Sequence, residues 1–128
     1  MAVTLVSRLD PWVPPLLLMG LIFFLSAQPD LDSGLGAIDL IGRKLIHAGE
    51  YGLLCLLWFR ALATRASAPR ASLIAFLVSV AYAATDEYHQ TFVAGRSGSV
   101  IDVAVDALGA GAVALALRRR SLPRKAVS

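Results

Sequence analysis

Long apolar runs with almost no charge are the feature that most constrains this chain of 128 residues. Apolar residues make up 57% of the sequence and charged residues 16%, where soluble domains carry roughly 25% charged residues. A chain this short folds as one domain and leaves about a third of its surface exposed, so it cannot hide that much apolar surface from water. The composition argues against a soluble enzyme and a disordered chain. The single cysteine, Cys55, also excludes a disulfide scaffold. The lipid bilayer is the solvent that fits.

Four apolar segments are separated by charged or turn-forming residues. They lie at about 12–27, 45–63, 71–85 and 100–117. A helix needs about 20 residues to cross the hydrocarbon core, so the first and third segments are short and we expect tilt or local thinning of the bilayer. Cleavage of the first segment as a signal peptide is disfavoured, because Leu25-Ser26-Ala27 lacks the small-x-small pattern. The sequence predicts an all-α, polytopic membrane protein. It would be one domain over 1–128, a bundle of four transmembrane helices with a short basic tail at 118–128.

Lysine and arginine residues predict the orientation of the bundle. One side carries nine of them: Arg8, Arg60, Arg65, Arg70, Arg118, Arg119, Arg120, Arg124 and Lys125. The other side carries only Arg43, Lys44 and Arg96. Because basic residues concentrate on the cytoplasmic side, we expect both termini to be cytoplasmic. We interpret the basic tail as a topology anchor that contacts anionic lipids, and we expect no nucleic-acid partner.

A small set of polar residues remains inside or at the edge of the apolar segments. Its members are Lys44, His47, Glu50, Tyr51, Tyr82, Asp86, Glu87, His89, Gln90, Asp102 and Asp106. Ionisable groups at membrane depth are costly and usually mark a function or a buried pair. In the predicted topology all of these residues fall in the outer half of the membrane or at its outer edge. We therefore expect one polar site that opens outward.

Helical spacing sorts most of these residues into three stripes. The stripes are Lys44, His47 and Tyr51 on the second segment, Tyr82, Asp86, His89 and Gln90 on the third, and Asp102 and Asp106 on the fourth. Glu87 is expected to point away from its neighbours. Gly109 continues the last stripe, and together with Gly111 it would let another helix approach closely. The three stripes predict a shared pocket.

The residue types in this pocket favour an anionic ligand. The second and fourth helices would present their N-termini outward beside Lys44 and Arg96, and such termini favour a phosphate or carboxylate. No His-x-x-x-His or similar spacing indicates a metal, and we expect no cofactor. Structural roles stay open: Ser99 and Asp102 fit a capping box, Lys44 and Glu50 could snorkel or pair, and the tyrosines could be interfacial aromatics.

The polar residues also form three motifs with defined spacing. They are Lys44-x-x-His47-x-x-x-Tyr51, then Tyr82-x-x-x-Asp86-Glu87-x-His89-Gln90-x-Phe92-Val93-x-Gly95-Arg96, and finally Asp102-x-x-x-Asp106-x-x-Gly109. Together they resemble the VanZ-like family of small bacterial membrane proteins, over about residues 20 to 117. The middle motif is the specific one. The family usually has Asn at the position of Asp106.

The resemblance implies a multi-pass protein of the bacterial inner (cytoplasmic) membrane that acts at the cell envelope. The family is named after an accessory protein linked to low-level resistance to the glycopeptide teicoplanin, so tolerance to such antibiotics is an expectation. The expected partner is a membrane lipid or a lipid-linked envelope precursor, and a homo-oligomer stays open. Candidate ligand-binding residues are Lys44, Tyr51, Tyr82, Gln90, Arg96 and Asp106. Candidate catalytic residues are His47, Asp86, Glu87, His89 and Asp102.

A second likeness leaves an enzymatic function open. Arg96-x5-Asp102-x3-Asp106 has the spacing of the last motif of phosphatidic-acid-phosphatase-type membrane enzymes, in which Arg binds phosphate, His is the nucleophile and Asp orients it. Asp102 stands at the nucleophile position here, and a carboxylate can accept a phosphoryl group. The alternatives to ligand recognition are therefore a lipid-phosphate hydrolase or headgroup transferase, and a non-catalytic scaffold whose stripes bond neighbouring helices.

Overall fold

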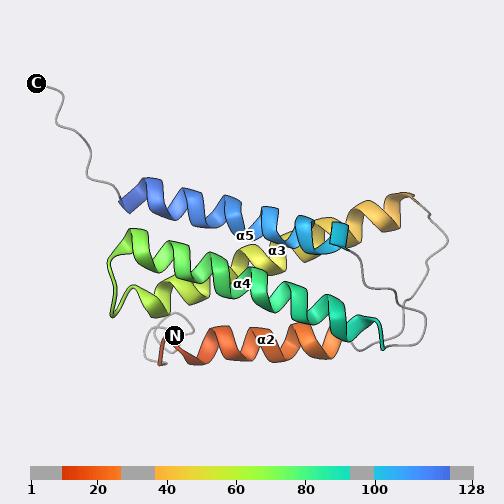
Figure 1. Cartoon of the computed structure of the whole chain (residues 1–128), viewed down its shortest axis with the longest axis horizontal. Coiled ribbons are helices and arrows are strands. Elements are labelled where there is room, and N and C mark those ends of the chain that lie inside the picture. The colour runs from red at the N-terminus through yellow and green to blue at the C-terminus, as the bar shows by residue number, and fades with distance from the viewer. Residues whose placement is uncertain (1–9, 27–36, 93–99, 122–128) are drawn as a thin grey trace, which may run out of the picture.

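The described part of the chain is made entirely of helices. The computed structural model describes residues 10–26, 37–92 and 100–121, and these form α2 (Val13–Ser26), α3 (Ala37–Leu62), α4 (Ala68–Gln90) and α5 (Val100–Ser121) with no strand. The helices run alternately in opposite directions along the long axis, so the described chain begins and ends at the same end of the bundle (Figure 1). Three of them, α3, α4 and α5, are long and apolar enough to cross a membrane. The predicted all-α polytopic fold is confirmed, and the side on which the termini lie stays a prediction.

The helix boundaries differ from the predicted spans. α2 has 14 residues and is therefore roughly 21 Å long at 1.5 Å per residue, shorter than the roughly 30 Å hydrocarbon core. α3 begins at Ala37 and α4 runs for 23 residues to Gln90. The expectation that the third span is short is therefore wrong. The apolar run ends near Thr85, but the helix continues because polar side chains of its last turns are buried against neighbouring helices.

α3 and α5 approach each other closely at two glycines. A Cβ atom built at Gly109 would overlap the backbone carbonyl of Ala48. At Gly52 a Cβ would lie 3.3 Å from the backbone oxygen of Gly109, so the two backbones touch along one turn. The prediction that Gly109 allows close helix packing is confirmed. Gly111 faces α4 instead, where a Cβ would make an ordinary contact of 3.4 Å with the Phe76 ring.

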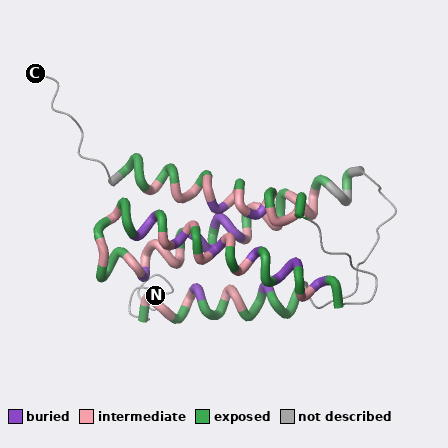
Figure 2. The backbone as a smooth tube through the Cα atoms, in the orientation of Figure 1, coloured by how far each residue is buried: buried purple, intermediate pink, exposed green. Residues whose placement is uncertain are grey.

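The remaining packing leaves α2 at the margin of the bundle. α2 packs on α3 and α4 but not on α5, whereas α3, α4 and α5 all pack on one another. Buried residues line the faces between the helices, and exposed residues follow the outer faces (Figure 2). Many of the exposed side chains are large and apolar, for example Leu17, Leu45, Leu73 and Leu108. Such an outer surface suits lipid rather than water.

Candidate functional site

One end of the bundle collects polar side chains from three helices, and an ion pair forms the outermost layer. Lys44 Nζ of α3 lies 2.9 Å from Asp102 Oδ1 of α5, within hydrogen-bond distance. The two side chains are 32% and 36% exposed, so the pair lies at the rim of the bundle. Asp102 is in the first turn of α5, where the free N–H groups of the helix also favour a carboxylate. Its proposed capping partner Ser99 lies outside the described residues.

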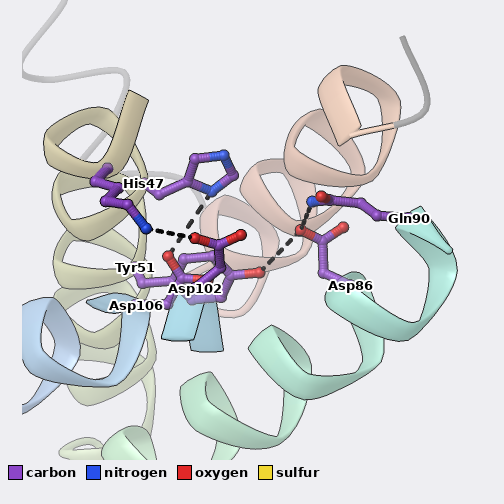
Figure 3. Close-up of polar contacts among 7 residues, drawn as sticks. His47, Tyr51, Asp86, Gln90, Asp102 and Asp106 are labelled. Atoms are coloured by element: carbon purple, nitrogen blue, oxygen red, sulfur yellow. Dashed lines mark hydrogen bonds and ion pairs between the residues drawn. The ribbon is translucent and has the colours of Figure 1, made fainter. Parts of the chain in front are cut away.

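A second layer lies below the rim and is more deeply buried. His47 Nδ1 of α3 is 3.7 Å from Asp106 Oδ1 of α5, one helical turn below the first pair (Figure 3). The Asp106 side chain is 0% exposed, and within the described part of the chain neither of its oxygens has a hydrogen-bond partner. Buried polar atoms are nearly always hydrogen-bonded in proteins. The buried carboxylate of Asp106 can therefore still accept hydrogen bonds, for example from a ligand.

The third layer joins α3 to α4. The Tyr51 hydroxyl donates to Asp86 Oδ2 at 3.4 Å, and Gln90 Nε2 donates to the same oxygen at 3.3 Å (Figure 3). All three residues are buried. Asp86 and Gln90 are one turn apart on α4, so the predicted stripe holds for this pair. Tyr51 is the only one of the three that comes from α3, and its phenol ring crosses the interface to reach the carboxylate.

The site contains more acidic than basic groups. Four further carboxyl groups, those of Glu50, Asp86, Glu87 and Asp102, are close enough to interact electrostatically with Asp106. Among the described residues only Lys44 and His47 can offset them within the three layers. In surroundings of low dielectric constant, neighbouring carboxylates repel strongly. The rim at Lys44 therefore suits an anion, and the buried layers beneath it suit a positively charged group.

Two predicted site residues of α4 contact α2. The Tyr82 hydroxyl donates to the backbone oxygen of Met19 at 2.5 Å. The His89 ring stacks on Phe23, with ring centroids 4.3 Å apart and planes inclined by 25°. The Tyr82 ring also lies beside the cluster, with its centroid 6.4 Å from that of Tyr51, so Tyr82 sits between α2 and α3, whereas His89 contacts α2. α4 is covered by α2 on one side and by α3 and α5 on the other, so its buried residues face two interfaces.

Glu87 has a different placement from the one its spacing predicted, and Glu50, which was assigned to no stripe, lies in the cluster. Glu87 was expected to point away, but it is 5% exposed and interacts electrostatically with Asp106. Glu50 interacts in the same way with His47 and Asp86, so it belongs to the cluster, although it was not named among the candidate binding or catalytic residues. Its place in the set of polar residues of the apolar segments is the signal in the sequence that indicates this.

The remaining candidates concern phosphate chemistry and metals. Arg96 lies outside the described residues, so the phosphatase-like motif is described only at Asp102 and Asp106. These two carboxylates are on successive turns of α5 but have different partners, Lys44 and His47. Within residues 10–26, 37–92 and 100–121, no three His, Cys, Asp or Glu side chains come together as metal ligands would.

Comparisons with known proteins identify the family. No curated protein and no solved structure matches the chain. A family model described as VanZ/LLP1 matches residues 12–120, which include all four helices except Ser121, the last residue of α5. This match covers most of the 128 residues and agrees with the resemblance carried by the three polar motifs. The chain belongs to the VanZ/LLP1 family of membrane proteins.

Proposed function

We propose that the polar cluster binds the headgroup of an amphipathic ligand, either a membrane lipid or a lipid-linked cell-envelope precursor. The observation that carries the proposal is the layering of the site. A cation at the rim, Lys44, stands above the buried carboxylate of Asp106, whose oxygens accept no hydrogen bond within the described part of the chain. Polar groups buried at membrane depth are costly and mark function more often than packing.

The charges indicate what the headgroup carries. Lys44 is one-third exposed, so a phosphate can replace Asp102 as its partner without either charge being buried. An amine on the same headgroup would be attracted to the acidic layers below, where Asp106 can accept hydrogen bonds. A headgroup that combines a phosphate with an amine therefore matches both layers, whereas a purely anionic one matches only the rim.

We assign this site to the outer face of a bacterial inner membrane. The assignment rests on the excess of Lys and Arg at the opposite end of the helices and on the family. A protein that binds an envelope lipid or precursor there would affect how the cell tolerates envelope stress. Tolerance of glycopeptides such as teicoplanin is the form of this effect that the family suggests.

Lipid binding to the purified protein tests the proposal. In detergent, we expect native mass spectrometry to show tighter binding of phosphatidylethanolamine, which has a phosphate and an amine, than of phosphatidylcholine with the same acyl chains. Lys44→Gln and Asp106→Asn should each weaken this binding by about tenfold, because a charge-assisted hydrogen bond contributes about 1.5–3 kcal/mol. Arg119→Gln, at the opposite end of α5, is the control. Equal binding by all variants contradicts the proposal, and phosphate release from phosphatidic acid would favour catalysis instead.

A scaffold role is the second candidate, because the polar contacts of the site connect different helices. Lys44 bonds across to α5 and Tyr51 across to α4. If these contacts serve only packing, Lys44→Gln will lower stability without changing lipid preference. If the site binds a headgroup, the same variant will lose lipid preference while its unfolding midpoint changes little, since the pair is partly exposed.

A further inference from the structure

A cavity lies at the end of the bundle opposite the polar cluster. It has a volume of about 500 Å³ and is formed by the beginning of α4 and the end of α5. Its walls include Leu73 and Phe76 of α4 and Ala114 and Leu115 of α5. Leu73 and Leu115 are 57% and 50% exposed, so the cavity opens onto the apolar outer surface of the bundle. A cavity of this size is sufficient for part of a small amphipathic molecule.

Two arginines border the same cavity. Arg70 lies in the first turn of α4 and Arg118 in the last turn of α5, and both line the cavity. Among the described residues, neither guanidinium forms an ion pair with an acidic group. The first turn of α4 has no acidic residue either. This end of the cavity therefore carries two positive charges without a described counter-charge.

The backbone adds to this positive character. Ser67, the N-cap residue of α4, makes no hydrogen bond from its side chain to the first turn. The N–H groups at the start of α4 therefore lack a side-chain cap, and the helix dipole places partial positive charge there. An anion between Arg70 and Arg118 would lie next to this helix start, and arginine matches the oxygens of a phosphate geometrically.

We propose that this cavity binds an anionic phospholipid of the leaflet that faces the chain termini. The phosphate lies between Arg70 and Arg118, and part of one acyl chain fills the cavity against Phe76 and Ala114. A lipid accounts for both halves of the site, because the apolar walls open where the bilayer is and the charges lie at the end where headgroups are. The site is separate from the polar cluster and does not depend on the function proposed for it.

Native mass spectrometry with phosphatidylglycerol tests this site in the full-length protein. We expect the double variant Arg70→Gln/Arg118→Gln to bind this lipid about tenfold more weakly, because juxtamembrane arginines attract anionic lipids. The matched control is Arg65→Gln/Arg119→Gln, which removes the same charge at the same end from two residues that, like Arg70 and Arg118, are exposed but do not line the cavity. Its binding should stay within about twofold of the wild type, because charges outside the cavity contribute only screened, general attraction.

Two further experiments distinguish binding of the lipid in this cavity from nonspecific electrostatic attraction to the arginines. Ala114→Phe fills the cavity and leaves both arginines in place, so it should also weaken binding. Its fold is checked by the protection of Cys55, and if it does not fold the arginine variants alone decide. Inorganic phosphate should not displace the lipid, because it leaves the apolar walls empty. Equal losses in the two arginine double variants, unchanged binding in Arg70→Gln/Arg118→Gln, or displacement by phosphate would each overturn the proposal.

Discussion

Replacing Gly109 by alanine probes the contact on which the polar cluster depends. The Cβ of alanine would overlap the backbone carbonyl of Ala48, and a backbone atom cannot rotate away as the end of a side chain can. α3 and α5 must therefore move apart at this point. The same two helices carry the pairs Lys44–Asp102 and His47–Asp106, so we expect the variant to lose stability and to loosen both pairs.

The size of the effect follows from a comparison within one helix. Gly111→Ala makes the same chemical change two residues away, where the new Cβ would meet the Phe76 ring at an ordinary 3.4 Å. Both substitutions gain up to about 1 kcal/mol of helix propensity, and this gain cancels when the two variants are compared. Overpacking a close contact costs about 1–3 kcal/mol. Gly109→Ala should therefore unfold about 1–3 kcal/mol more easily than Gly111→Ala.

The single cysteine supplies the assay. Cys55 is 0% exposed, so a maleimide should label it only when the bundle opens. Labelling across a titration of mixed micelles with a denaturing detergent gives the free energy of unfolding for each variant. If Gly109→Ala is as stable as Gly111→Ala, the close approach of α3 and α5 is not a feature of the protein in its membrane-like environment, and the reasoning fails.

Three other results are expected. A double-mutant cycle with Lys44→Gln and Asp102→Asn should give a coupling free energy of about 0.2–1 kcal/mol, as for exposed ion pairs. A coupling free energy of several kcal/mol would contradict the position of this pair at the rim. Tyr82→Phe should lower the free energy of unfolding by about 1 kcal/mol and should speed hydrogen exchange in α2 but not in α5. If exchange in α2 is unchanged, the Tyr82 hydroxyl does not hold that helix in place. Reporter fusions after Gly95 and after Ser128 should lie on opposite sides of the membrane, with Ser128 cytoplasmic. Two cytoplasmic reporters would refute the predicted orientation.

The fold could be predicted to a large extent because the bilayer restricts what an apolar chain can do. Apolar runs predicted the number and order of the helices, and the position of Gly109 predicted a close contact between helices. The ends of the helices were harder to predict. Hydropathy falls after Thr85, yet α4 continues to Gln90, since a polar residue buried by its neighbours does not end a helix.

The directions of individual side chains in the candidate site were only partly predictable. Helical periodicity assigns residues to faces of one helix, but it does not say which neighbour covers each face. His89 and Asp86 are both turned inward on α4, yet His89 meets Phe23 of α2 while Asp86 meets Tyr51 of α3. Glu87 was misplaced for the same reason, because α5 covers the face on which it lies. Lys44 and Asp102 are paired as their stripes suggested, since each is the outermost member of its stripe.

The hydrogen bond that attaches α2 to α4 has a consequence for how this sequence can change over time. Its acceptor is the main-chain carbonyl of Met19, which every amino acid presents equally. Substitutions at position 19 therefore leave the bond intact as long as the new side chain suits the surrounding lipid. Tyr82 has no such freedom, because the donor is its own hydroxyl. We expect the sequence of α2 to drift between relatives while the tyrosine that holds it does not.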